Sequence, residues 1–137
     1  MPKVDSETYI TIQQAVKKFE NVEREVSNLT GLNVSEVEVV FYLQSAGSLS
    51  HTNICKLCNA DKAAVSRVLA KMEAKDLIES YYEGSNKKTL FSKLTGKGNE
   101  IALKIKESFN YIVKDGLVGL TKEETNTFLR LLAKIVK

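Results

Sequence analysis

Long apolar runs are absent from this sequence of 137 residues. A membrane-spanning helix needs about 18 or more consecutive apolar residues, and no stretch approaches that length. The first seven residues are polar and lack the apolar core of a secretory signal. We therefore expect a cytoplasmic protein without a membrane-spanning helix.

Residues that commonly carry catalysis or bind metals are also scarce. The chain has one histidine, His51, and two cysteines, Cys55 and Cys58. This excludes catalysis built on several imidazoles, and two closely spaced thiols do not form a disulfide scaffold. The sequence also lacks a glycine-rich phosphate loop and the G-x-S-x-G motif. It therefore indicates no catalytic residue, no metal site and no cofactor, and we expect a protein that is not an enzyme.

Charge is unevenly distributed along the chain. Residues 1–48 carry four basic and seven acidic side chains, a net of −3, whereas residues 49–98 carry nine and five, a net of +4. Residues 99–137 carry seven and five, a net of +2. A basic middle beside an acidic N-terminal segment is typical of a protein with one surface that faces a polyanion.

Proline is restricted to position 2, so long periodic segments can form uninterrupted helices. Apolar residues at three- and four-residue spacing predict six helices, over residues 6–29, 35–45, 50–59, 61–75, 96–114 and from 121 onward. Ser35 with Glu38 and Thr121 with Glu124 each predict a capping box at a helix start. The first helix should bury a stripe that includes Ile12, Val16 and Leu29, and the last should bury Phe128, Leu132 and Ile135.

The period changes after residue 75. Residues 77–82 and 89–94 are rich in β-forming side chains and flank a polar, basic segment at 83–88, which predicts a β-hairpin. The predicted fold class is therefore mainly α with a small β-hairpin.

Two of the predicted helices are separated by only Asn59 and Ala60, a spacing typical of helix-turn-helix units. Asn tolerates the left-handed backbone that such a turn often needs. The second helix, capped by Asp61, exposes small or cationic side chains. Small residues let a backbone approach a DNA groove, and Lys or Arg reaches phosphates or guanine edges. The alternative is an ordinary solvated face, but the basic hairpin directly downstream favours a DNA-binding surface.

Five segments in this order and spacing carry a family resemblance: ICKLC at 54–58, KAAVSR at 62–67, MEAKDLIE at 72–79, KK at 87–88 and LTGKG at 94–98. Together they resemble the winged helix-turn-helix of the MarR-type bacterial transcriptional regulators. The flanking long helices match as well, so the resemblance covers essentially the whole chain.

The resemblance implies a single domain, 1–137, with a winged helix-turn-helix lobe at 34–98 and dimerisation helices at 6–33 and 99–137. The outer segments also carry more apolar positions than one winged-helix core needs. The implied function is sequence-specific binding of double-stranded DNA, most often as a homodimeric repressor on a pseudo-palindromic operator. A small-molecule effector pocket between the dimerisation helices and the DNA-binding lobe is implied too, without any indication of its ligand.

The resemblance also assigns DNA contacts residue by residue. Lys62, Ala63, Ser66 and Arg67 would face the major groove, with Lys71 near phosphate. Ser50 and Thr52 would meet the DNA backbone, where free N–H groups at a helix start favour anions. Asn86, Lys87 and Lys88 form the tip of the hairpin, and the two lysines would enter or flank the minor groove.

Three positions depart from the family pattern. Asn86-Lys87-Lys88 stands where Asp-x-Arg is common, and Lys lacks the planar fork with which Arg reads a narrow groove. Asp76 replaces a usual Gly at the helix exit. Asp61 replaces Ser or Thr; it caps well but puts an acid near phosphate.

His51, Cys55 and Cys58 are spaced i, i+4, i+7 and so share one helix face. A thiol switch or metal site on this face is one interpretation. The other is that both cysteines pack in the core, where free Cys is commonly found, while His51 lies at the surface. Two alternative functions follow: a thiol-responsive regulator that uses Cys55 and Cys58, or a winged-helix module that binds a protein partner.

Overall fold

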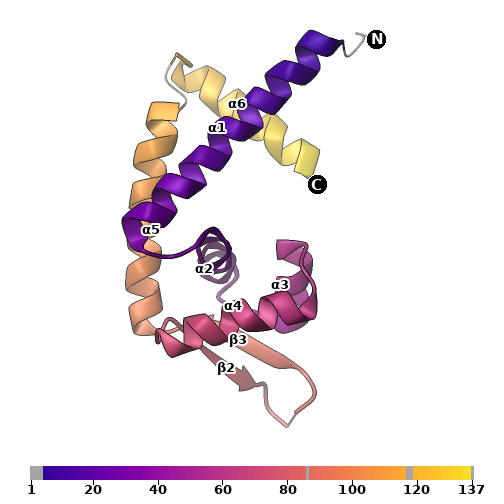
Figure 1. Ribbon diagram of the computed structural model, residues 1–137, viewed down its shortest axis with the longest axis vertical. Helices are drawn as coiled ribbons and strands as arrows, with labels where there is room; N and C mark the ends of the chain where they lie inside the picture. Colours follow the sequence, from indigo (N-terminus) through magenta and orange to yellow (C-terminus); the bar gives the residue numbers. More distant parts are fainter. Residues whose placement is uncertain (1–4, 86, 117–118, 137) are drawn as a thin grey trace.

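The computed structural model describes residues 5–85, 87–116 and 119–136, without the side chains of 111–116. Within these residues the chain forms six helices and three strands, in agreement with the predicted fold class (Figure 1). The elements in order are α1 (Ser6–Thr30), α2 (Val34–Ala46), β1 (Ser48–Ser50), α3 (His51–Cys58), α4 (Lys62–Ala74), β2 (Ile78–Tyr82), β3 (Leu90–Leu94), α5 (Gly96–Gly116) and α6 (Lys122–Val136).

The elements gather at two ends of the molecule. Helices α2, α3 and α4 and the strands lie at one end, whereas α1 and α6 cross at the other, where both termini lie (Figure 1). Helix α5 runs from the sheet towards α6 and packs against α1. The first lobe is thus formed mainly by the continuous stretch from α2 to β3, whereas the second brings together helices from the two ends of the chain.

The sheet is antiparallel, with strand order β1-β3-β2. Strands β2 and β3 form the predicted hairpin, in a register that pairs Ile78 with Leu94 and Tyr82 with Leu90. Strand β1, which was not predicted from the sequence, has three residues and pairs Ser48 with Lys93. A strand this short leaves no alternating pattern to detect.

The core lies where α2, α3, α4 and α5 meet the sheet. Its largest fully buried apolar side chains are Leu43, Ile54, Met72 and Ile105, one from each of these helices. Burying a side chain of this size contributes about 1.5–3 kcal/mol. These four residues therefore hold the helix-turn-helix against the rest of the lobe.

The N-cap of helix α2 is Asn33, two residues before the predicted Ser35, so the Ser35–Glu38 capping box is wrong. The Asn33 side chain accepts the Glu36 N–H at 2.9 Å, and the Glu36 carboxylate accepts the Asn33 N–H at 3.1 Å. Glu36 also forms an ion pair with Lys75. It is buried, and both its oxygens accept bonds from Lys75 Nζ, at 2.8 and 3.1 Å. The start of α2 is therefore tied to the residue that ends α4.

Helix α4 is defined at both ends by local chemistry, much as predicted. Asp61 is the N-cap and accepts the Ala64 N–H at 2.7 Å. Asn59, in the preceding turn, has a left-handed backbone with φ of 50°. At the other end Asp76 is also left-handed, with φ of 60°, and Leu77 N–H bonds back to the Met72 carbonyl. This is a Schellman motif in which Asp occupies the position that usually holds Gly.

The LTGKG segment closes the hairpin through three hydrogen bonds centred on Thr95. Its hydroxyl donates to the Asp76 carbonyl at 2.6 Å and accepts the Gly98 N–H at 3.0 Å. Its own N–H donates to the Leu77 carbonyl at 3.0 Å. Gly98 packs so closely on Leu77 that an added Cβ would lie 2.0 Å from this carbonyl oxygen. The Thr and the Gly of this segment thus fix how α5 leaves the sheet.

The outer helices depart from the predicted burial. Val22 and Val26 of α1 are buried, but Ile12 and Leu29 are 52% and 70% exposed, and Val16 is also exposed. In α6, Ile135 is 78% exposed and Leu132 is exposed, while Phe128 stacks on Phe19 with ring centroids 6.3 Å apart. Periodicity identified apolar faces correctly, but the single chain leaves much of them uncovered.

Replacing Lys75 with Met should lower the free energy of unfolding by about 1–3 kcal/mol, because the buried Glu36 carboxylate loses its counter-ion. The lower part of that range applies if water replaces the ammonium, since the Lys75 side chain is 43% exposed. Denaturant unfolding measures the change, with Lys71→Met, one turn away on the exposed face of α4, as control.

Adding Glu36→Gln to Lys75→Met should restore part of the lost stability. The neutral amide needs no counter-ion, and its oxygen can still accept the Asn33 N–H. A double variant no more stable than Lys75→Met would contradict the assignment of the loss to an unpaired carboxylate.

Candidate nucleic-acid interface

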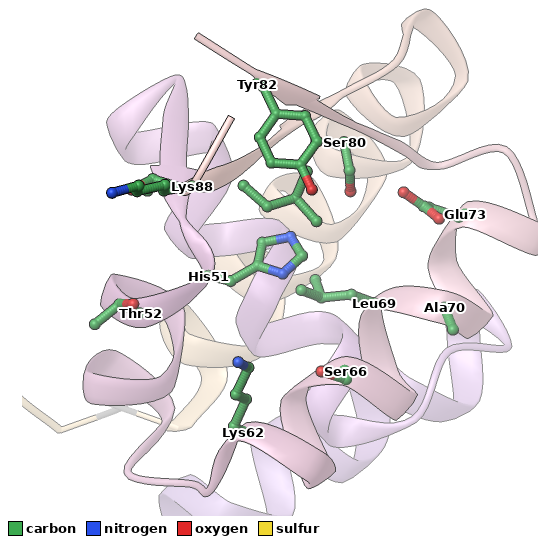
Figure 2. Close-up of a pocket in the computed structure, with 12 residues that line it drawn as sticks. His51, Thr52, Lys62, Ser66, Leu69, Ala70, Glu73, Ser80, Tyr82 and Lys88 are labelled. Atoms are coloured by element: carbon green, nitrogen blue, oxygen red, sulfur yellow. The ribbon is translucent and has the colours of Figure 1, made fainter. Parts of the chain in front are cut away.

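A groove of about 460 Å³ lies between α4, the start of α3 and the β-hairpin (Figure 2). Its lining combines cations, hydroxyls and a few apolar side chains: His51, Thr52, Lys62, Ser66, Leu69, Ala70, Glu73, Ser80, Tyr82, Lys88, Thr89 and Leu90. The structure therefore brings four of the predicted site residues, Thr52, Lys62, Ser66 and Lys88, to one concave surface.

Helix α4 forms one wall. Lys62, Ser66 and Ala70 follow at four-residue spacing and are all exposed, so they share one side of the helix. Two of the three are small, which leaves the α4 backbone accessible from the groove. Glu73 lies on the same side one turn further and adds a negative charge, which was not among the site residues predicted from the sequence.

Ala63, Arg67 and Lys71 are also exposed on α4 but do not line the groove. At 100° per residue they occupy the neighbouring side of the helix. The exposed surface of α4 therefore has two parts: one lines the groove, and the other, with Arg67 and Lys71, lies beside it on the helix.

The hairpin forms the opposite wall. Lys88, Thr89 and Leu90 lead into β3, while Ser80 and Tyr82 come from β2. Figure 2 shows Lys88 and Tyr82 across the opening from Lys62 and Ser66. Lys87 is exposed beside Lys88. Asn86, the third predicted residue of the tip, lies outside the described residues.

The two predicted residues at the start of α3 differ in accessibility. Thr52 is exposed and lines the groove. Ser50 is buried, and its hydroxyl accepts the Asn53 N–H at 3.1 Å as the N-cap of α3. The structure thus gives the Ser50 side chain a capping role.

His51 is partly buried, contrary to the surface position expected from the sequence. Its Nε2 lies 2.9 Å from the Ser92 hydroxyl, which is in turn 3.1 Å from the Ser80 hydroxyl. Burial lowers the pKa of His51 below its ordinary value of 6.5, and nearby Lys62 lowers it further, while Glu73 opposes the shift. The neutral imidazole therefore links α3 to both hairpin strands at the base of the groove.

Cys55 and Cys58 are free thiols, half-buried at the margin of the core. Burial raises the pKa of Cys58, and the negative charge of Glu38 adds to the rise. Less thiolate means lower reactivity towards oxidants and metals. Among the described residues, no group of three or more His, Cys, Asp or Glu side chains is placed to hold a metal ion.

Comparison with known proteins agrees with this geometry. Residues 32–90 match the MarR family. The chain is 27% identical over 122 residues to the "Uncharacterized HTH-type transcriptional regulator YdgJ" of Bacillus subtilis (strain 168), a match that covers 89% of this chain and 73% of that protein. The family match over residues 32–90 agrees with the resemblance seen in the sequence.

Solved structures share the whole fold. A mutant MarR from E. coli complexed with operator DNA is 19% identical, with a TM-score of 0.78 over 96% of this chain and 95% of that one. NadR in complex with 4-hydroxyphenylacetate is 18% identical, with a TM-score of 0.79 over 100% and 96% of the two chains. These likenesses confirm the winged-helix architecture, with helices from both ends of the chain around it. None of the described helices is long and apolar enough to cross a membrane.

Acidification should destabilise the protein through His51. Because the folded state keeps the pKa of His51 below 6.5, the unfolded chain binds a proton first as the pH falls, so the free energy of unfolding should decrease from about pH 7 towards pH 5. The decrease should be smaller in His51→Asn. Denaturant unfolding at a series of pH values measures this, and equal slopes for the two proteins would show that His51 does not contribute.

Proposed function

We propose that the chain, whose residues 32–90 match the MarR family, is a transcriptional regulator of that family. In this proposal it binds double-stranded operator DNA sequence-specifically as a homodimer and acts as a repressor. The observation that carries the proposal is the exposed, cation-bearing surface of α4 beside a hairpin that carries Lys87 and Lys88. The relative YdgJ is named a transcriptional regulator, and the E. coli MarR structure contains operator DNA.

In this proposal α4 is the recognition helix and enters the major groove. Ala63, Ser66 and Ala70 keep its exposed surface narrow, so the backbone can approach the bases. Arg67 is the residue best suited to read a guanine, because its planar fork donates two parallel hydrogen bonds. Lys62 and Lys71 flank it and neutralise phosphates.

The hairpin and α3 would bind the DNA backbone on either side. Lys87 and Lys88 reach the phosphates or the edge of the minor groove. The Thr52 hydroxyl, in the first turn of α3, donates a hydrogen bond to the DNA backbone. Ser50 contributes indirectly, because its hydroxyl caps α3. Glu73 repels phosphate, so DNA would follow the Lys62 end of the groove and avoid the Glu73 end.

Homodimerisation is supported by the uncovered apolar faces of the outer helices. Exposed apolar side chains recur along α1 and α6, at Tyr9, Ile10, Ile12, Val16, Leu129, Leu131, Leu132, Ile135 and Val136. Exposed apolar surface on this scale is typical of a protein–protein interface. A second copy of the chain would cover it and set the spacing of two α4 helices on a two-fold symmetric site.

Two alternatives have less support. A thiol-responsive regulator needs a reactive thiolate, and the raised pKa of Cys58 opposes this. A module that binds a protein partner gains nothing from the basic hairpin. An enzyme is not proposed, because the hydroxyl beside His51 is that of Ser92, which is fully buried and so is not accessible to a substrate in the groove.

Replacing Arg67 with Ala should weaken binding to the specific operator by about 1–3 kcal/mol, roughly 5- to 150-fold, if Arg67 reads a base. Binding to unrelated DNA should change much less. Fluorescence anisotropy on both DNAs measures this, with Lys56→Ala, an exposed residue of α3 that does not line the groove, as control. An equal loss on both DNAs would instead indicate a phosphate contact.

Introducing charge into the apolar faces should dissociate the dimer. We expect the wild-type chain to sediment as a dimer at micromolar concentration, and the double variant Ile12→Lys/Ile135→Lys to sediment largely as a monomer with weaker operator binding. Gln13→Lys/Lys134→Met, at neighbouring exposed positions, is the control. A monomeric wild type would overturn this part of the proposal.

A further inference from the structure

A second cavity lies between α1, α2 and α5 and measures about 270 Å³. It shares no lining residue with the groove between α4 and the hairpin. Its walls are mostly apolar, with Val26, Val37, Phe41 and Phe109 contributing side chains. Phe41 and Phe109 meet edge to face, with ring centroids 5.4 Å apart. The volume is near the lower end for ligand pockets and suits a molecule with a single ring.

Two carboxylates give this cavity its charge. Glu23 from α1 and Glu38 from α2 both line it, and both are partly buried. Neither forms an ion pair or a hydrogen bond with the residues that the structure describes. No Lys or Arg side chain of the described residues lines the cavity.

The negative charge of Glu38 also acts on two neighbouring side chains, Glu23 and Tyr42. Burial raises the pKa of Glu23, and the nearby charge of Glu38 raises it further. Tyr42 also lines the cavity, and its hydroxyl donates to the Leu57 carbonyl at 3.2 Å. Burial raises the pKa of this hydroxyl, and the charges of Glu38 and Glu23 add to the rise. These shifts indicate negative charge that the described residues leave uncompensated.

We propose that the cavity binds a small aromatic ammonium ion and excludes aromatic carboxylates. The positive charge would sit between Glu23 and Glu38, where it compensates both carboxylates at once. The aromatic walls add to the preference, because a cation is attracted to the faces of Phe and Tyr rings. An anion of the same shape would meet like charge with no cation to offset it. The ring of the ligand would pack against Phe41 and Phe109.

The cavity occupies the region in which the sequence resemblance implies an effector pocket. The inference rests on the proposed regulatory function only for its consequence, an effect of the ligand on DNA binding. Ligand binding itself is a property of the isolated protein.

The test compares three probes with the same phenol ring and different charge. Tyramine carries an ammonium group, tyrosol a neutral hydroxyl at the same position, and 4-hydroxyphenylacetate a carboxylate. Calorimetric titration of the full chain without DNA should give tyramine about tenfold tighter binding than tyrosol, and 4-hydroxyphenylacetate the weakest binding of the three.

Charge-removing variants locate the effect. Glu23→Gln and Glu38→Gln should each weaken tyramine binding about three- to tenfold and leave tyrosol binding unchanged. The double variant should bind tyramine and tyrosol about equally. Glu25→Gln, an exposed residue of α1 outside the cavity, is the matched control and should behave as the wild type. The unfolding midpoint of each variant verifies folding, and the comparison of probes on the wild type requires no variant.

Three results would overturn the proposal: equal or tighter binding of 4-hydroxyphenylacetate, an ammonium preference that survives in the double variant, or no binding of any probe at millimolar concentration. Operator binding is measured separately on the same preparation without probe. Loss of the ammonium preference with intact operator binding refutes this inference alone. The preference without any DNA binding refutes the proposed function and leaves the cavity assignment in place.

Discussion

The position of α4 depends on the ion pair between Glu36 and Lys75. Glu36 lies in the first turn of α2 and Lys75 is the C-cap of α4, so one buried carboxylate joins two helices that otherwise pack through apolar core side chains. Apolar packing fixes how close the helices lie, but a charge-assisted hydrogen bond also fixes their rotation and register. The same carboxylate caps α2 through the Asn33 N–H. The orientation of the exposed side of α4 is thereby fixed within the folded chain.

Further polar ties fix the hairpin relative to α4. Thr95 binds the carbonyls of Asp76 and Leu77, just after α4, and His51 binds Ser92 in the central strand. Ser92 is fully buried and also contacts Ser80, so both hairpin strands share one hydrogen-bonded chain with α3. These hydrogen bonds therefore hold α4 and the hairpin, the two walls of the groove, in fixed positions relative to each other. Such preorganisation reduces the entropy that binding would otherwise cost.

Local chemistry decided what the sequence could predict. The Asp61 cap, the left-handed Asn59 and the hairpin over residues 77–94 each depend on neighbours a few positions away, and all three were predicted. The His51–Ser92 and Glu36–Lys75 bonds join residues 41 and 39 positions apart, so no local sequence pattern predicts them. Burial of Ile12 and Ile135 was wrong for the single chain, because periodicity identifies an apolar face without identifying what covers it. The contacts of Lys62, Ser66 and Arg67 with DNA stay a prediction.

Acidic and basic side chains are concentrated at different sites, so the two proposed ligands would bind to different surfaces. The acidic N-terminal third supplies Glu23 and Glu38 to the cavity among α1, α2 and α5, while the basic middle supplies Lys62 and Lys88 to the groove. A polyanion and a small cation would thus be drawn to different surfaces and would not compete for one site. The first turn of α2 contacts both systems, because Glu36 holds Lys75 while the adjacent Val37 and Glu38 line the cavity. Any displacement of that turn moves the carboxylate that orients α4, so the cavity and the recognition surface share one mechanical element.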